Sequence, residues 1–172
     1  QWSNGEPITA DTFIYSWKMA LDPNLLYESC SVLASNFIEI ENASAYYAQL
    51  STGNTVSWDE VGIKKIDDLT LEIRTVRPYS AQDVMRHFTN RTSGPVYETL
   101  YESSLNDSRT TTTYGTELTN DMVFSGPFML TDWVKGSQRI FTKNDSYIYA
   151  DMVHLDGMNV RVIKEKSTQI EL

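Results

Sequence analysis

The spacing of apolar residues changes along this chain, and that change limits the possible folds more than any other feature. Phe13, Trp17 and Leu21 recur at helical spacing and form one apolar stripe over residues 10–21. From residue 61 onward, apolar and polar residues alternate instead, which is typical of β-strands. We therefore expect a mixed α+β chain.

Short local signals set the ends of the helices. Thr9 is a suitable N-cap for the helix over residues 10–21, and Asp22-Pro23 ends that helix because the residue before a proline avoids the helical conformation. Further helical segments are predicted over residues 30–37 or 41–50, with Gly53 as a stop, and over residues 81–90, with Ser80 as the capping residue.

The alternating segments predict two groups of strands. One is a β-hairpin over residues 61–74, with Asp67-Asp68 at its turn and with Leu69, Leu71 and Ile73 on one buried face. The other group comprises strands over residues 124–133, 138–143 and 158–164. Three such strands are expected to form a sheet that lacks its neighbours.

The stretch between these two groups lacks a sustained period. Residues 98–120 are rich in Ser, Thr, Asn and Asp, so we expect them to form a connecting excursion on the surface. We place the boundary between two lobes near Tyr97, which gives domains over residues 1–97 and 98–172.

Composition and charge exclude several classes of function. The chain has 14 Lys and Arg against 23 Asp and Glu, a formal net charge of −9, so its surface repels phosphate backbones and we expect no nucleic-acid partner. Cys30 is the single cysteine, which rules out an internal disulfide and a multi-cysteine metal site. With only His87 and His154, a zinc site would have to lean on carboxylates. We expect neither a metal nor a cofactor.

The sequence also offers no clear catalytic group. Asp67-Asp68 is a carboxylate pair, but its place at a predicted turn favours a structural role. His87 and His154 have no nucleophile at readable spacing, so we interpret both as structural or exposed. Cys30 lies in no reactive motif and is interpreted as a small buried filler. Among the tyrosines, Tyr27 lies in a polar loop after a helix and is available for a ligand.

The chain opens with Gln1 rather than with an initiator methionine. It contains no run of about 18 apolar residues, the length needed to span a bilayer. We expect a piece of a longer protein, whose signal peptide or lipid anchor would lie upstream.

Five separated motifs occur in order along the chain. They are Trp2-Ser3-Asn4-Gly5-Glu6-Pro7 through Tyr15-Ser16-Trp17, Ala20-Leu21-Asp22-Pro23, residues 61–73 (VGIKKIDDLTLEI) followed by Arg77-Pro78-Tyr79, residues 125–133 (SGPFMLTDW), and residues 143–147 (KNDSY). In sequence and in order they resemble motifs of the family 5 extracellular solute-binding proteins, the oligopeptide- and dipeptide-binding receptors of ABC importers.

This resemblance implies a partial α+β fold of the periplasmic-binding-protein type (class II, cluster C). Residues 1–97 would supply most of the small extra domain of peptide receptors, and residues 98–172 part of the main N-terminal lobe. The implied function is non-catalytic: a monomer binds oligopeptides outside the cell and delivers them to the membrane permease of an ABC transporter. The protein would be periplasmic, or lipid-anchored at the cell surface.

The resemblance also indicates candidate ligand contacts. In such receptors the second domain lends a tyrosine to the peptide, which makes Tyr27 the candidate contact and Ser29 its rival.

Two other functions stay open. A receptor of the same family could bind another solute, such as a sugar, a nickel complex or a peptide pheromone. A more distant alternative is a secreted hydrolase, which needs two carboxylates about 5–10 Å apart in a cleft.

Overall fold

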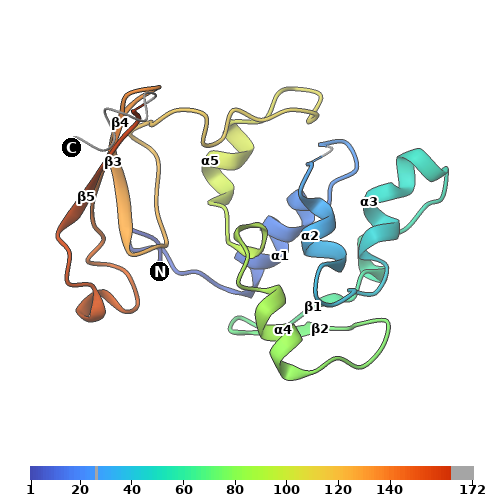
Figure 1. Ribbon diagram of the computed structural model, residues 1–172. Helices are drawn as coiled ribbons and strands as arrows, with labels where there is room; N and C mark the ends of the chain where they lie inside the picture. The colour runs from blue at the N-terminus through green and yellow to red at the C-terminus, as the bar shows by residue number, and fades with distance from the viewer. Residues whose placement is uncertain (26, 164–172) are drawn as a thin grey trace. The chain divides into compact units, whose positions relative to one another are not determined.

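The computed structural model describes residues 1–25 and 27–163, which form two compact units (Figure 1). One unit is Ile8–Thr113, and the other combines Gln1–Pro7 with the residues from Tyr114 onward. The division after Thr113 lies beyond the expected boundary near Tyr97, because a helix that follows Tyr97 packs on the first helix of the chain. In the part of the chain described, no helix is long and apolar enough to cross a membrane.

The unit Ile8–Thr113 is mainly helical. Its elements are α1 (Ala10–Ala20), α2 (Cys30–Ser35), α3 (Ala43–Thr52), β1 (Ile63–Asp67), β2 (Thr70–Ile73), α4 (Ala81–His87) and α5 (Glu98–Ser103), with short 3₁₀ helices at Trp58–Glu60 and Arg91–Ser93. The expected helix over residues 10–21 is confirmed by α1, and both alternative segments before residue 53 contain a helix. The expectation that residues 98–120 form only a connecting excursion is wrong, because α5 lies within them.

The predicted hairpin is confirmed, with two corrections. The turn residues are Asp68 and Leu69 rather than Asp67 and Asp68, because Asp67 is the last residue of β1. Ile63 pairs with Ile73 in antiparallel register, and the Asp67 carboxylate accepts a hydrogen bond from the Leu69 backbone at 2.8 Å across the turn. Leu71 and Ile73 pack against the core as expected. Leu69 does not share their buried face: it lies in the turn itself and is 88% exposed.

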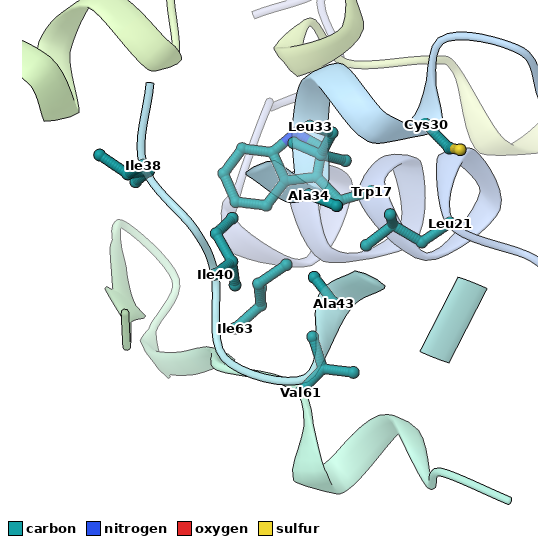
Figure 2. Packing of buried hydrophobic residues seen from close by; sticks show 10 residues of the cluster. All are labelled: Trp17, Leu21, Cys30, Leu33, Ala34, Ile38, Ile40, Ala43, Val61 and Ile63. Carbon is teal, nitrogen blue, oxygen red and sulfur yellow. The ribbon is translucent and has the colours of Figure 1, made fainter. Parts of the chain in front are cut away.

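Trp17 lies at the centre of the core of this unit (Figure 2). Its indole stacks on Phe88 with ring centroids 5.3 Å apart, and its N–H donates to the Ser93 carbonyl at 3.1 Å. In Figure 2 the ring lies beside Leu33 and Ala34 of α2. The expectation that Trp17 is a core residue is confirmed, since 5% of it is exposed.

His87 is a structural part of the same core. Its side chain is fully buried, its Nε2 donates to the Leu33 carbonyl at 2.8 Å, and its Nδ1 accepts from the Ile38 backbone at 3.4 Å. A ring that donates through one nitrogen and accepts through the other is neutral. Burial lowers the pKa of His87, against the opposing effect of the hydrogen bond to Leu33.

The other unit holds an antiparallel three-stranded sheet in the order β3-β4-β5. Its elements are β3 (Phe128–Val134), β4 (Gln138–Lys143), the short 3₁₀ helix Ala150–Met152 and β5 (Gly157–Arg161). The first strand begins after Pro127 rather than at Phe124, because the Phe124 carbonyl instead accepts a hydrogen bond from the Ser3 backbone at 2.8 Å. β5 ends at Arg161, and Lys164, the expected last residue of this strand, lies outside the described residues.

This sheet unit buries little. Of its residues that the structure describes, Trp2 and Asn144 are buried, and every residue of β5 is exposed. The Asn144 side chain donates to the Gly126 carbonyl at 2.8 Å and accepts from the Ser146 backbone at 3.1 Å, so it fixes the chain around β3.

Replacement of Trp17 by alanine should lower the free energy of unfolding by about 3–5 kcal/mol, because a large cavity is left and the Ser93 carbonyl loses its donor. Urea denaturation followed by circular dichroism measures this change. Leu69→Ala, at an exposed turn position, is the matched control and should change stability by less than about 0.5 kcal/mol. Equal stability of Trp17→Ala and the unsubstituted chain would contradict the assignment of Trp17 to the core.

The buried, neutral His87 predicts a pH dependence of stability. The pKa of His87 in the folded chain lies below the value of 6.5 for an unperturbed histidine. The contribution of neutral His87 to the free energy of unfolding is therefore fully present above pH 6.5, and it is lost as the pH falls through the pKa of the folded state. Urea denaturation between about pH 8 and pH 5 should show this decline.

The two histidines provide a matched pair for this test. His87→Gln should flatten the pH dependence, whereas His154→Gln, at an exposed position, should keep it. A slope that His87→Gln leaves unchanged would show that His87 is not the titrating group.

Candidate functional site

The loop between α1 and α2 contains both residues predicted as ligand contacts. Asp22 turns the chain, because its carboxylate accepts hydrogen bonds from the backbone and side-chain N–H groups of Asn24 at 2.8 and 3.0 Å. Tyr27 follows and is 41% exposed, while its carbonyl accepts from the Cys30 backbone at 3.0 Å. Ser29 is half-buried at the N-terminal cap of α2. The Tyr27 ring is therefore the more accessible of the two side chains.

A hydrogen-bonded network joins α1 to α5 in the same unit. The Tyr15 hydroxyl donates to Glu102 Oε1 at 2.6 Å, and the Arg109 guanidinium donates to both Glu102 oxygens, at 2.6 and 3.0 Å. Arg109, and after it Tyr15, lower the pKa of Glu102 to about 2, so Glu102 is a carboxylate at any neutral pH. We call Tyr15, Glu102 and Arg109 the Glu102 network.

Sequence reasoning missed the Glu102 network for a physical reason. Tyr15 and Glu102 are separated by 87 positions, and Arg109 lies in a segment without a periodic pattern. A long-range ion pair of this kind has no local signature, because it depends on which helices pack together.

The groups that a hydrolase would need are not arranged for catalysis. Asp67 and Asp68 are both exposed at the hairpin turn rather than held in a cleft. Cys30 is buried, and a hydrogen bond with its thiol raises the pKa of Tyr47. His154 is exposed, and His87 is buried in the core. Within residues 1–25 and 27–163, no cluster of His, Cys, Asp and Glu is placed to hold a metal ion.

An open groove in the sheet unit was not singled out from sequence. It has a volume of about 600 Å³ and is lined by Pro127, Phe128, Tyr147, Tyr149, Met152, Val153, His154 and Leu155. The lining is mostly apolar, so the groove can receive apolar side chains but has few polar groups to orient a ligand. The only sequence signal is the density of aromatic and aliphatic residues over 147–155.

Comparisons with known proteins agree on one protein family. The model of the bacterial extracellular solute-binding proteins, family 5 middle region, matches residues 1–172. The oligopeptide-binding protein OppA of Bacillus subtilis is 31% identical over 171 residues, which cover 99% of this chain and 28% of that protein.

Two solved structures extend this comparison. Listeria monocytogenes OppA bound to peptide matches with a TM-score of 0.78 and 31% identity, covering 100% of this chain and 30% of the other. The pheromone receptor PrgZ, whose mode of peptide binding has been described, matches with a TM-score of 0.81 and 25% identity, covering 100% of this chain and 31% of the other.

The chain therefore spans 28–31% of the length of these relatives. Its fold is part of a periplasmic-binding-protein-like fold of mixed α+β type, which confirms the expected fold class at that level. The resemblance carried by the five motifs is confirmed as well. Since the family model matches the whole chain, the chain belongs to the bacterial extracellular solute-binding proteins of family 5, a family of non-catalytic binding proteins.

Proposed function

We propose that this chain supplies part of the oligopeptide-binding component of a bacterial ABC importer, which binds peptides outside the cell and delivers them to the membrane permease. The observation that carries this proposal is the similarity along the whole chain, at a TM-score of 0.78, to an OppA whose structure holds a peptide. Receptors of this kind bind without transforming the ligand, in keeping with the exposed Asp67 and Asp68 and the buried His87.

Within this function, Tyr27 is the proposed ligand contact and Ser29 the rival. A tyrosine combines an apolar ring with a hydroxyl that donates to a peptide carbonyl, which suits recognition of a main chain with varied side chains. The exposure of Tyr27 and its place in a turn between two helices support this role. Ser29 offers only a small hydroxyl at a half-buried position.

The placement of the chain in a whole receptor is also a proposal. Residues 1–97 would form most of the small extra domain and residues 98–172 part of the main lobe. The self-contained core of Ile8–Thr113 supports an extra domain in this region. The receptor would act as a monomer, in the periplasm or anchored by a lipid at the cell surface, with the permease as its partner.

One alternative within the family has an observation in its favour, namely the similarity to the pheromone receptor PrgZ over the whole chain. A pheromone receptor would bind one peptide sequence, whereas a nutrient importer binds many. Calorimetric titration of the full-length receptor with a peptide mixture, single apolar peptides, sugars and a nickel complex separates these cases. Binding of the sugar or the nickel complex alone would overturn the peptide proposal.

Substitution of Tyr27 by alanine in the full-length receptor should weaken peptide binding at least about threefold, since one hydrogen bond and the ring contact are lost. Tyr27→Phe separates the two contributions, because it keeps the ring and removes the hydroxyl. Leu50→Ala, at an exposed position on α3, is the control and should bind as the unsubstituted receptor does. Unchanged affinity in Tyr27→Ala, with weaker binding in Ser29→Ala, would transfer the assignment to Ser29.

The 172-residue chain alone should fold but should bind no peptide up to about millimolar concentration, which corresponds to about 4 kcal/mol of binding free energy. A receptor that encloses its ligand excludes water and supplies hydrogen-bond partners from several sides. A chain that forms only part of the binding site can do neither. Tryptophan fluorescence and calorimetry with a peptide mixture measure this. Micromolar binding would show that this chain carries a complete site.

A further inference from the structure

Three separate segments of the unit Ile8–Thr113 meet at one carboxylate, that of Glu102. Tyr15 reaches it from α1 at 2.6 Å, and Arg109 reaches it from the segment after α5 at 2.6 and 3.0 Å. A two-pronged guanidinium–carboxylate pair fixes both partners in orientation as well as in distance. The Tyr15 and Tyr101 rings also meet edge to face, with centroids 6.1 Å apart, which closes the contact between α1 and α5.

The segment that carries Arg109 is held in one shape by its own hydrogen bonds. The Asn106 carboxamide oxygen accepts from the Thr110 and Thr111 backbones at 2.8 and 3.1 Å, and the Arg109 backbone donates to the Asn106 carbonyl at 2.8 Å. Arg109 itself has a left-handed backbone with φ 55°, which a non-glycine residue adopts at some energetic cost. A strained residue persists where its surroundings fix it, and such residues concentrate at functional sites.

Arg109 also touches the end of α1 from which the Tyr27 loop departs. Its guanidinium lies 3.8 Å from the Met19 sulfur, in the last turn of α1. The charge of Asp22, at the start of the loop, contributes to raising the pKa of Arg109, after the larger effect of Glu102. Burial first, and then the charge of Asp22, raise the pKa of Tyr101, and Tyr27 adds a smaller contribution. In Figure 1 the yellow segment after α5 and the blue segment before α2 lie at the same end of the unit.

From this geometry we propose that Arg109 is a positioning residue for the ligand-contact loop. Glu102, which also accepts from Tyr15, orients the guanidinium of Arg109 against Met19. The Met19 carbonyl in turn accepts a hydrogen bond from the Asp22 backbone at 3.3 Å, where the loop that carries Tyr27 begins. This inference rests on the proposed function, because it assigns Arg109 a part in peptide binding through Tyr27. The role assigned to Arg109 is indirect, because Glu102 already pairs with its guanidinium through two hydrogen bonds.

Such a role is separable from stability. Half-exposed ion pairs add little to the free energy of unfolding, and the Arg109 and Glu102 side chains are 47% and 37% exposed. A loop that is already ordered binds more tightly, because less conformational freedom is lost on binding. Loss of the network should therefore change the order of the loop and the affinity more than the melting temperature.

The first experiment measures loop order without any ligand. Hydrogen exchange of the backbone amides of Asn24 and Cys30 is compared in the 172-residue chain and in Arg109→Met, Arg109→Lys and Glu102→Gln. We expect both amides to exchange at least about threefold faster in Arg109→Met and Glu102→Gln than in the unsubstituted chain. The exchange rate in Arg109→Lys should be intermediate, since lysine keeps the positive charge but cannot donate two parallel hydrogen bonds to a carboxylate. The Ile40 amide, which donates to the Ala34 carbonyl in the core, should exchange unchanged.

Arg77→Met is the matched control, because it removes another arginine of the same unit. The guanidinium carbon of Arg77 lies 4.2 Å from the centroid of the Tyr79 ring. It should leave the exchange of Asn24 and Cys30 unaffected. Unchanged exchange of both loop amides in Arg109→Met would overturn the positioning role, whatever the protein binds. Faster exchange of the Ile40 amide to the same extent would also overturn it, since the effect would then be general destabilisation.

The second experiment is a double-mutant cycle on peptide affinity in the full-length receptor. Arg109→Met should weaken binding about as much as Tyr27→Ala, and the double variant should bind no more weakly than Tyr27→Ala alone. Independent, multiplying losses would show that Arg109 does not act through Tyr27. Absence of peptide binding by the unsubstituted receptor would refute the proposed function, while the exchange experiment would still decide the role of Arg109 in ordering the loop.

Discussion

The burial of Trp17 is the interaction on which the unit Ile8–Thr113 depends. The indole covers Phe88 and reaches the Ser93 carbonyl, so one side chain of α1 joins the first helix to a segment more than seventy residues later. His87, next to Phe88, extends the same contact to the Leu33 carbonyl in α2 and to the Ile38 backbone. The indole nitrogen of Trp17 and both ring nitrogens of His87 are buried and hydrogen-bonded. The free-energy cost of an unpaired buried polar group is therefore avoided. The buried cluster that contains Trp17 also includes residues of α2, α3 and β1.

Those parts of the fold that have local causes could be predicted from sequence. The apolar stripe of α1 and its end at Asp22-Pro23 act within a few residues, and the alternating pattern of the hairpin does the same. Leu69 shows the limit, because alternation gives the face of a residue only while the strand continues. The turn comprises Asp68 and Leu69, one residue later than the predicted Asp67-Asp68, so Leu69 lies outside both strands. α5 was missed because its six residues include none that is fully buried and its contact to Tyr15 spans most of the unit.

The residues of the candidate site also differ in whether a local sequence signal indicates them. Tyr27 could be proposed from sequence because a polar loop after a helix end is visible locally. The Glu102 network and the apolar groove of the sheet unit could not, since each collects residues by tertiary packing rather than by spacing. A charged residue inside a stretch of Ser, Thr and Asn, as Arg109 is, gives no sign in the sequence that its backbone is left-handed or that its partner is Glu102.

The bonds within the loop explain why its order must come from outside it. Asp22 bonds to Asn24, and Tyr27 bonds through its carbonyl to Cys30. These contacts are short in sequence, and they leave Tyr27 41% exposed. Short-range turns fix the path of the backbone but not the direction in which an exposed ring points. Outside the loop, the Arg109 guanidinium lies 3.8 Å from the sulfur of Met19, whose carbonyl accepts a hydrogen bond from the Asp22 backbone. In the role proposed for Arg109, the loop would draw its orientation from the Glu102 network, while the core around Trp17 holds α1 in place.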